Sequence, residues 1–439
     1  MRSDRGSRQC LCVVGGGVTG LAAGAVSGAP VFEQSDGPGG ICRSYYMKAF
    51  SPDRTGRAPS DDEAYRFEVG GGHWIFGSDP AVLDVIRELV PLTEYQRRAA
   101  VYIGRLGKTV PYPLQAHVGL LGGDLGQRAG AEWRELQDES KEPTTLREWL
   151  QLSFGTTLCE LFFFPFNDRY TAGLSDSIAP QDAYKSPAFT PTQSAGQSSG
   201  YNAGFRYPEG GLDRLAAALE ARCDVRYGKR LSRIATQERL LVFDDGSEQP
   251  YETVLCTVAL HEAIELAGLV VPETPDPHTS VLVLNIGAER GRECPDVHWQ
   301  YEPDSRAGFH RIGFYSNVDA GFLPARYRAT GGAVSLYVER AYPAGQRPSN
   351  EEIACYQREV VAELQERDYL GEVHVIDPSW VEVAYTWRYP GSGWRTQAIE
   401  ALAAHGIHQV GRYGTWHFQG IADSIRDGYA AGRRLHGSA

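Results

Sequence analysis

The chain has 439 residues, of which 42% are hydrophobic and 22% charged, a composition typical of a globular protein with about two or three domains or subdomains. Its formal net charge of −12 disfavours a nucleic-acid partner, because nucleic-acid phosphates would be repelled. The eight cysteines are scattered without a C-x-x-C pair or a zinc-type His cluster, which predicts reduced thiols, no metal site and a cytoplasmic location. The polar first nine residues and the absence of a long apolar run predict neither secretion nor a membrane span.

The first motif of the chain is a glycine-rich turn that follows a short apolar segment. Leu11–Val14 has the pattern of a buried strand, and Gly15, Gly17 and Gly20 follow at the G-x-G-x-x-G spacing that opens a helix. Such glycines allow a tight turn, a close approach of a pyrophosphate to backbone N–H groups, and helix packing on the strand. A purely structural glycine turn is the alternative, but the flanking strand and helix favour a dinucleotide site.

The next apolar pair supports the same interpretation. Val31 and Phe32 predict a second strand, and Glu33 at its end is placed to accept hydrogen bonds from an adenosine ribose. The pair Gly39-Gly40 follows soon afterwards, as in flavoproteins of the glutathione-reductase type. We therefore predict FAD rather than NAD as the cofactor.

A third glycine run precedes a histidine. Residues 45–65 are mostly polar and are expected to form a loop, after which the chain reads EVGGGHW over residues 68–74. Glycines before a histidine and an aromatic residue indicate a backbone that passes close to something flat. His73 is therefore expected beside the flavin ring, although a loop histidine without a function is the simpler alternative.

The middle of the chain contains hairpin and helix patterns. Residues 80–96 have helical periodicity, a hairpin is expected around Gly107, and helices are expected over 125–137 and 144–164. The aromatic run that ends the second helix is more typical of a core than of a ligand site. Residues 186–204 contain few bulky aliphatic side chains and are interpreted as a flap or linker.

Regular structure is predicted again from residue 205 onward. A helix over 212–221 is followed by strands at 223–227, 231–235, 239–243 and 253–258, with Asp245-Gly246 as a hairpin turn. Further strands at 280–287, 308–316, 332–339 and 373–385 predict an antiparallel substrate sheet, with a helix over 350–367. The fold class that these elements predict is α/β.

The C-terminal segment contains a last strand that runs into a helix. Gln409 and Val410 end the strand, Gly411 and Arg412 follow, and Ala422, Asp423 and Ser424 lie in the first turn of the next helix. The partial positive charge of a helix N-terminus stabilises nearby negative charge by about 0.3–1 kcal/mol. Reduced flavin has such charge on its pyrimidine edge, so this segment is predicted to contact the cofactor.

In this order the motifs resemble those of the UDP-galactopyranose mutases, most closely their eukaryotic-like branch, within the glutathione-reductase-like and amine-oxidase-like flavoproteins. The stretches that carry the resemblance are VVGGGVTGL, EVGGGHWIF, GKTVPYPLQ, LFFFPFNDR, FRYPEGG, FHRIGFYSN, WRYP and GRYGTWHF. The resemblance implies an FAD-binding domain with a parallel sheet and β-meander (residues 1–95, 205–275 and 391–439), a hairpin and inserted helical domain (96–204), and an antiparallel substrate sheet (276–390).

The resemblance also implies a function. In that family FAD works in its reduced form without net redox change: its N5 forms an adduct with the sugar of a nucleotide-linked hexopyranose, which then recloses as a furanose. The implied partners are a nucleotide sugar and an external reductant, either NAD(P)H or a flavin reductase, with an oligomer possible and no membrane or nucleic acid. A galactose-like or deoxy sugar is expected.

Several site residues are implied by matching positions. Arg311 matches one of two arginines that hold the diphosphate, and Lys185 lies near the position of the other. The implied catalytic set is His73, Arg311, Lys185, Tyr301, Tyr389 and Phe418, and the implied substrate contacts are Tyr112, Gln115, Phe166, Asn167 and Arg311. The implied cofactor contacts are Gly15, Gly17, Val18, Thr19, Gly20, Glu33, Gln34, Gly39, Gly40, Gly72, Val225, Gly411, Arg412, Ala422, Asp423 and Ser424.

Three positions depart from the family pattern. Phe418 stands where a tyrosine is usual, Phe166 replaces another tyrosine, and Thr171 replaces a tryptophan that would touch the sugar. These departures leave the substrate open. An FAD-dependent oxidase or desaturase of the amine-oxidase or protoporphyrinogen-oxidase type is the alternative function, and a flavin-bearing binding protein without catalysis is a third. Arg311 favours the mutase, because an oxidase site is typically an apolar cage without a phosphate clamp.

Overall fold

A five-stranded parallel sheet forms the base of the protein. The computed structural model describes residues 10–77, 79–136, 142–181 and 203–436. The strands lie in the order β19-β13-β1-β2-β9, and every neighbouring pair is parallel. Their bounds are Leu11–Val14 for β1, Val31–Phe32 for β2, Val225–Arg226 for β9, Thr253–Cys256 for β13 and Ile407–Gln409 for β19. The predicted strands at both glycine motifs are confirmed.

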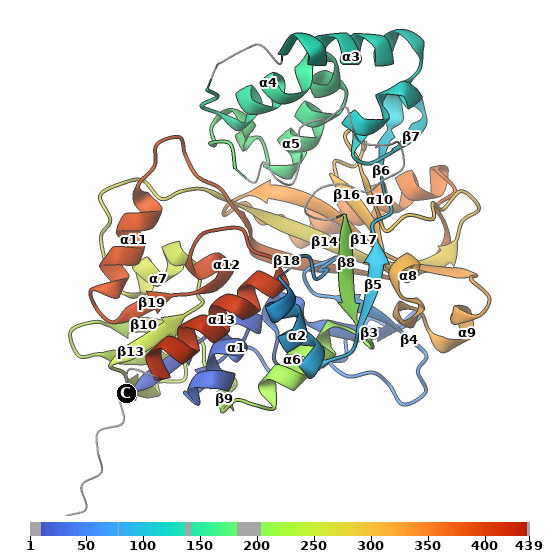
Figure 1. Ribbon diagram of the computed structural model, residues 1–439. Helices are drawn as coiled ribbons and strands as arrows, with labels where there is room; N and C mark the ends of the chain where they lie inside the picture. Colours follow the sequence, from blue (N-terminus) through green and yellow to red (C-terminus); the bar gives the residue numbers. More distant parts are fainter. Residues whose placement is uncertain (1–9, 78, 137–141, 182–202, 437–439) are drawn as a thin grey trace, which may run out of the picture.

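Both faces of this sheet are covered, as the continuous apolar runs of its strands require. Val13 and Leu255 pack toward α1 (Val18–Ser27) and α13 (Ile421–His436), at the lower left of Figure 1. Val14 and Cys256 face the opposite side, toward α7 (Leu260–Leu266), α11 (Trp394–Ala403) and a three-stranded antiparallel meander. The meander strands are β10 (Leu231–Ala235), β11 (Leu240–Phe243) and β12 (Glu248–Pro250). The predicted α/β fold with a parallel sheet and a β-meander is confirmed.

A seven-stranded, mostly antiparallel sheet stands above the parallel one, in the order β18-β14-β17-β16-β15-β6-β7. Its strands are β6 (Ala99–Ile103), β7 (Lys108–Pro111), β14 (His278–Arg290), β15 (Trp299–Tyr301), β16 (Arg311–Phe314), β17 (Ala333–Pro343) and β18 (Leu370–Thr386). Helix α10 (Asn350–Glu366) begins with a capping box between Ser349 and Glu352 and covers one face. The predicted strand over 308–316 is shorter in the structure, because α8 (Tyr315–Val318) begins directly after β16.

Two segments differ from their predicted structure. The supposed loop over 45–65 contains most of a hairpin, in which β3 (Ser44–Lys48) pairs with β4 (Ala64–Glu68), and only its middle is irregular. The helix predicted over 80–96 is α2 (Pro80–Leu89), which ends before Pro91, and the remaining residues form β5 (Leu92–Gln96). Strand β5 pairs with β8 (Gly204–Pro208), a partner more than 100 positions away that the local pattern did not reveal.

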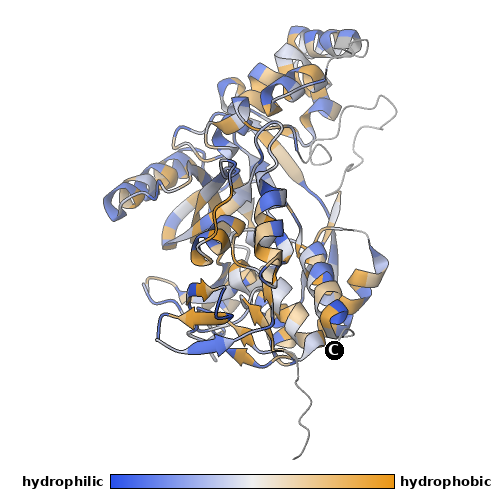
Figure 2. Cartoon of the chain, turned by 90° about the vertical axis from the view of Figure 1, so that its left-hand side faces the viewer, coloured by the Kyte–Doolittle hydropathy of each residue, from blue (hydrophilic) through white to orange (hydrophobic). Residues whose placement is uncertain are grey.

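A helical segment lies above the β6–β7 edge of the large sheet, at the top of Figure 1. It comprises a 3-10 segment over Leu114–Leu121, α3 (Gly123–Leu136), α4 (Leu146–Leu158), a π-helical turn over Cys159–Phe163 and α5 (Phe164–Tyr170). Phe154 and Phe163 stack at 3.9 Å, so most of the aromatic run is core as predicted. Figure 2 shows hydrophobic and hydrophilic residues alternating along these helices, as expected of helices with one buried face.

The remaining helix between the parallel strands is α6 (Leu212–Glu220), close to the predicted range. Most of the predicted flap over 186–204 lies outside the described residues, and the division of the chain into five parts stays a prediction. Five of the eight cysteines are buried, and all eight are free thiols. No helix in the described part of the chain is long and apolar enough to cross a membrane.

Candidate active site

One cavity of about 610 Å³ joins the carboxyl edge of the parallel sheet to the antiparallel sheet and the helical segment. It is lined by residues from both of the regions to which the sequence analysis assigned a dinucleotide and a substrate. The predicted residues that line it are Gly15, Gly17, Val18, Thr19, Glu33, Gln34, Gly39, Gly40, Gly72, His73, Tyr112, Phe166, Asn167, Tyr301, Arg311, Gly411, Arg412, Phe418 and Ser424. Segments from both ends of the chain therefore meet at one site.

A glycine is needed at each of the three positions of the first motif for a different structural reason. A Cβ on Gly20 would lie 1.9 Å from the Gly15 carbonyl oxygen, and one on Gly15 would lie 2.0 Å from Thr257 Oγ1. A Cβ on Gly17, the N-cap of α1, would meet no protein atom within 4 Å and would project where the cavity lies. The first two glycines serve the packing of the protein, whereas Gly17 leaves a cradle at a helix N-terminus that fits a pyrophosphate.

Glu33 is a buried carboxylate at the end of β2. It accepts hydrogen bonds from the backbone N–H groups of Gly16 at 2.5 Å and Ser35 at 2.8 Å, and its side chain also lines the cavity. These bonds fix its orientation, and a carboxylate keeps further lone pairs that can accept ribose hydroxyls. The residues present at this end of the cavity thus fit the adenosine part of a dinucleotide.

The C-terminal segment reaches the cavity only in part. Gly411 begins a helical turn, Arg412 Nη2 donates to the Ala384 carbonyl at 2.5 Å, and Ser424 also lines the cavity. Ala422 does not, because it packs in the hydrophobic core, and Asp423 is engaged with Arg426 at 3.1 Å. Ala422 and Asp423 therefore do not line this cavity, and their contact with the cofactor stays a prediction.

Two further predicted cofactor contacts lie off the cavity surface. Gly20 is covered by the β1–α1 turn, as its close approach to Gly15 requires. Val225 pairs with Val31 in the sheet and packs on the core, whereas Lys229 and Leu231 line the cavity at this end. Val225 therefore does not line the cavity, and its contact with the cofactor stays a prediction.

His73 lies on the cavity wall beside Gly72, and its place beside the flavin ring stays a prediction. Its Nδ1 is 3.2 Å from the Gly71 carbonyl oxygen, a geometry that assigns the proton to Nδ1 and leaves Nε2 as an acceptor. Burial, together with the charge of Arg412, lowers the pKa of His73 to about 4. The imidazole is therefore neutral at physiological pH.

Arg311 also lies on the cavity wall and is held by a buried acid. Its Nε and Nη2 donate to the two carboxylate oxygens of Glu339 at 2.9 and 2.7 Å, and Nη2 lies 3.5 Å from the Tyr385 hydroxyl. The pKa of Glu339 falls to about 2 because the attraction of Arg311 and contacts with His310 outweigh the burial that would raise it. The guanidinium is thus fixed in orientation, and its charge is balanced by one carboxylate.

Aromatic side chains form the remaining wall around Arg311. Tyr112 and Tyr301 lie with ring centroids 4.7 Å apart, and Phe166 contacts Tyr301 at 5.2 Å. Tyr170 and Tyr385, which the sequence did not single out, contact each other at 4.5 Å and also line the cavity. Tyr170 is the last residue of α5, beyond the helix predicted over 144–164. It stands one position before Thr171, which the sequence analysis did consider.

Three described residues that the sequence analysis considered, Tyr389, Gln115 and Thr171, do not line the cavity. Tyr389 follows the end of β18, its backbone N–H donates to Asp276, and its side chain is not on the cavity; Tyr385 takes that place. Gln115 is buried in the 3-10 segment, away from the cavity surface. Thr171 is fully buried and donates to the Asn167 carbonyl at 2.8 Å, so no gap opens toward a sugar there. Lys185 lies outside the described residues.

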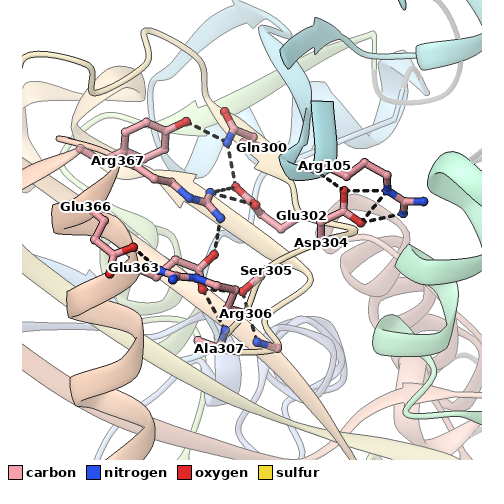
Figure 3. Close-up of polar contacts among 12 residues, drawn as sticks. Arg105, Gln300, Glu302, Asp304, Ser305, Arg306, Ala307, Glu363, Glu366 and Arg367 are labelled. Atoms are coloured by element: carbon pink, nitrogen blue, oxygen red, sulfur yellow. Dashed lines mark hydrogen bonds and ion pairs between the residues drawn. The ribbon is translucent and has the colours of Figure 1, made fainter. Parts of the chain in front are cut away.

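The connection between β15 and β16, which runs from Tyr301 to Arg311, is fastened to α10 by a buried ionic network (Figure 3). Arg367 Nη1 donates to both oxygens of Glu302 at 2.9 and 3.0 Å and also binds Glu363, which accepts the Ala307 N–H at 2.8 Å. On the other side, Arg105 pairs with Asp304 at 2.7 Å. These contacts hold residues 302–307 of the connection in place between Tyr301 and Arg311, which both line the cavity.

Comparisons with known proteins agree with this fold. The family model described as flavin-containing amine oxidoreductase matches residues 29–436. A crystal structure of reduced UDP-galactopyranose mutase superposes with a TM-score of 0.82 at 20% identity, covering 98% of this chain and 96% of that one. A putative protoporphyrinogen oxidase from Exiguobacterium sp. 255-15 gives 0.69 at 16% identity, covering 99% of this chain and 100% of that one. A putrescine oxidase double mutant gives 0.61 at 15% identity, covering 97% and 98%, respectively.

Proposed function

The chain belongs to the family of flavin-containing amine oxidoreductases and binds FAD, and from this premise we propose that it is a nucleotide-sugar mutase that uses reduced FAD. The proposed reaction interconverts a nucleotide-linked hexopyranose and its furanose without net redox change. When bound and reduced, FAD would supply a nucleophilic ring nitrogen. Membership in the eukaryotic-like branch of the galactopyranose mutases is part of the same proposal.

One observation carries this proposal: an oriented guanidinium lies on the wall of the same cavity as the dinucleotide cradle. Arg311 is fixed by Glu339, and the Tyr385 hydroxyl lies beside it. Preorganised donors of this kind stabilise charge that develops on a leaving diphosphate. An oxidase site of the amine-oxidase type is typically an apolar cage, so a fixed guanidinium on the wall favours a diphosphate ligand over an amine.

The other wall residues have roles that fit such a substrate. The rings of Phe166 and Tyr170 are stacked at 5.7 Å and present aromatic surface for a nucleobase or sugar. Neutral His73 has an acceptor nitrogen at the cofactor end and adds no positive charge there. Together these side chains bind and orient the ligand, while Arg311 holds the diphosphate.

The test of the proposed function is the redox dependence of isomerisation. Protein reduced with dithionite should convert at least one nucleotide-linked hexose in a panel, whereas the oxidised protein should leave all of them unchanged. Product analysis by chromatography and NMR would follow both forms. Oxygen consumption with amines or porphyrinogens, without any sugar isomerisation, would support the oxidase alternative and refute the mutase. NAD(P)H and a flavin reductase are the reductants to try next.

The predicted preference for a deoxy sugar depends on Phe418, because Thr171 does not line the cavity. Phe418 lies on the cavity wall, with the Arg412 guanidinium carbon 4.5 Å from the centroid of the Phe418 ring. The Phe418 side chain has no hydroxyl to pair with a sugar. A nucleotide-linked 6-deoxyhexose should therefore compete well against its galactose counterpart. Phe418→Tyr should shift the kcat/KM ratio toward galactose by roughly 5- to 150-fold, the effect of one unpaired polar group.

A competition assay with reduced enzyme on the same nucleotide measures both ratios. Phe166→Tyr is a matched control, since it adds the same hydroxyl to another aromatic residue of the cavity wall. Equal preference for galactose in wild type and Phe418→Tyr would show that Phe418 does not determine the sugar preference.

A further inference from the structure

His310 is a buried histidine on the cavity wall that the proposed reaction has not used. Its side chain is 1% exposed, its Nδ1 has no hydrogen-bond partner among the described residues, and Glu339 is the polar neighbour of its Nε2. Nε2 approaches Glu339 Oε2 to 3.4 Å, and the ring contacts Tyr170 at 5.5 Å and Phe166 at 6.1 Å. An unsatisfied buried polar group of this kind is costly and calls for a reason.

The charges around His310 explain why it is neutral without ligand. Burial lowers its pKa, the carboxylate of Glu339 on β17 acts in the opposite direction, and Arg311 on β16 and Arg169 on α5 lower it further. The two aromatic residues that pack on the ring have no carboxylate. The three charged side chains nearest the ring thus include two cations, which oppose a third positive charge as long as only one anion is present.

A bound diphosphate would change this balance. Glu339 already neutralises Arg311, so a ligand with two negative charges would meet an ion pair whose net charge is zero. Bringing such an anion into a buried site is costly unless a cation compensates it. His310 can supply a new positive charge at this ion pair, because its Nε2 lies 3.4 Å from the shared carboxylate.

We propose that His310 takes up one proton when a nucleoside-diphosphate sugar binds beside Arg311. The proton comes from solvent and bonds to the free lone pair of the imidazole, and no other bond changes. The imidazolium then donates to Glu339, and the group of His310, Glu339 and Arg311 presents one net positive charge to the diphosphate. This inference rests on the proposed function, because it requires a diphosphate in the cavity.

The pH dependence follows from the sign of this change. Ligand binding favours the charged form, so the pKa of His310 in the complex lies above that in the free protein. Between these two values the affinity should fall as pH rises, by up to tenfold per pH unit, and outside them it should be flat. Glu339 and Arg311 keep their charges in this interval, since the pKa of Glu339 is about 2 and that of Arg311 is well above its usual range.

Calorimetry with oxidised holoenzyme tests the proposal directly. UDP-galactose is a suitable probe, because its diphosphate is a diester that does not titrate between pH 5.5 and 8 and the oxidised protein should not convert it. Titrations in two buffers with different ionisation enthalpies give the number of protons taken up. Wild type should take up a large fraction of one proton per ligand, whereas His310→Gln and His310→Asn should take up almost none and lose the pH slope.

His374→Gln is the matched control, since His374 is a buried histidine outside the cavity and its loss should leave proton uptake unchanged. Flavin absorbance and thermal unfolding show that each variant is folded and loaded. Binding without proton uptake in wild type, or uptake that persists in both His310 variants, would overturn this inference and leave the proposed function intact. Failure of UDP-galactose and of every other nucleotide sugar to bind would refute both.

Discussion

Replacing Gly17 with valine should give a folded protein that contains no FAD. The backbone of Gly17 has φ −70°, which valine adopts without strain, and a Cβ would meet no protein atom within 4 Å. The new side chain would therefore occupy the cradle at the start of α1 rather than disturb the core. Its cost to the folded chain should be about 1 kcal/mol, from the loss of a favourable N-cap residue.

The measurement is flavin absorbance per protein after purification, together with thermal unfolding compared with FAD-stripped wild type. The apoprotein is the correct reference, since a ligand that binds only the native state adds stability of its own. Gly20→Val provides the contrast: its Cβ would lie 1.9 Å from the Gly15 carbonyl, so this variant should lose its fold as well as its flavin. Fully loaded, yellow Gly17→Val protein would refute the assignment of the cradle.

Replacing Arg311 with alanine should reduce mutase turnover by about 10²- to 10³-fold, the usual effect of removing one preorganised donor to developing charge. The structure adds a second effect. Glu339 is 2% exposed and would be left as a buried carboxylate without its partner, which typically costs about 3–5 kcal/mol of stability. Without Arg311, burial would raise the pKa of Glu339 above that of a glutamate in the unfolded chain. The free energy of unfolding of the variant should therefore decrease as pH increases above the usual pKa of a glutamate.

The double variant Arg311→Met, Glu339→Gln separates these two effects. It removes the guanidinium and the carboxylate together, so most of the stability should return while turnover stays low. FAD content should be normal in all of these proteins, because neither side chain belongs to the cradle. Turnover on a nucleotide sugar within threefold of wild type in the double variant would show that Arg311 does not hold the diphosphate.

The parts of the fold that could be predicted are those with a strong local signal. The strand, glycine turn and second strand at the start of the chain have a spacing that is readable in about 25 residues. Long strands such as β14 and β17 were recognised from their apolar residues, although their ends were placed several residues short. The pairing of β5 with β8 could not be read, because it depends on contacts between distant segments.

The site shows the same limit. Gly72, His73 and Arg311 were found because each lies within a short motif, and the structure brings them into one cavity. Tyr389 was predicted and Tyr385 was not singled out, because a sequence match does not show where a strand ends or which side chain faces inward. Glu339 and His310 were not found at all, since a lone acid in a strand and a histidine before an arginine have no pattern of their own. Their significance is a matter of burial and distance.

Two neighbouring residues of strand β18, Ala384 and Tyr385, contact both of the arginines that line the cavity. The Ala384 carbonyl accepts a hydrogen bond from Arg412, and the Tyr385 hydroxyl lies 3.5 Å from Arg311. The side that we assign to the cofactor and the side that we assign to the substrate therefore share one peptide unit. Suppose that the substrate binds the protein with reduced flavin more tightly than the protein with oxidised flavin. Thermodynamic reciprocity requires that bound substrate then changes the reduction potential of the flavin by the equivalent free energy.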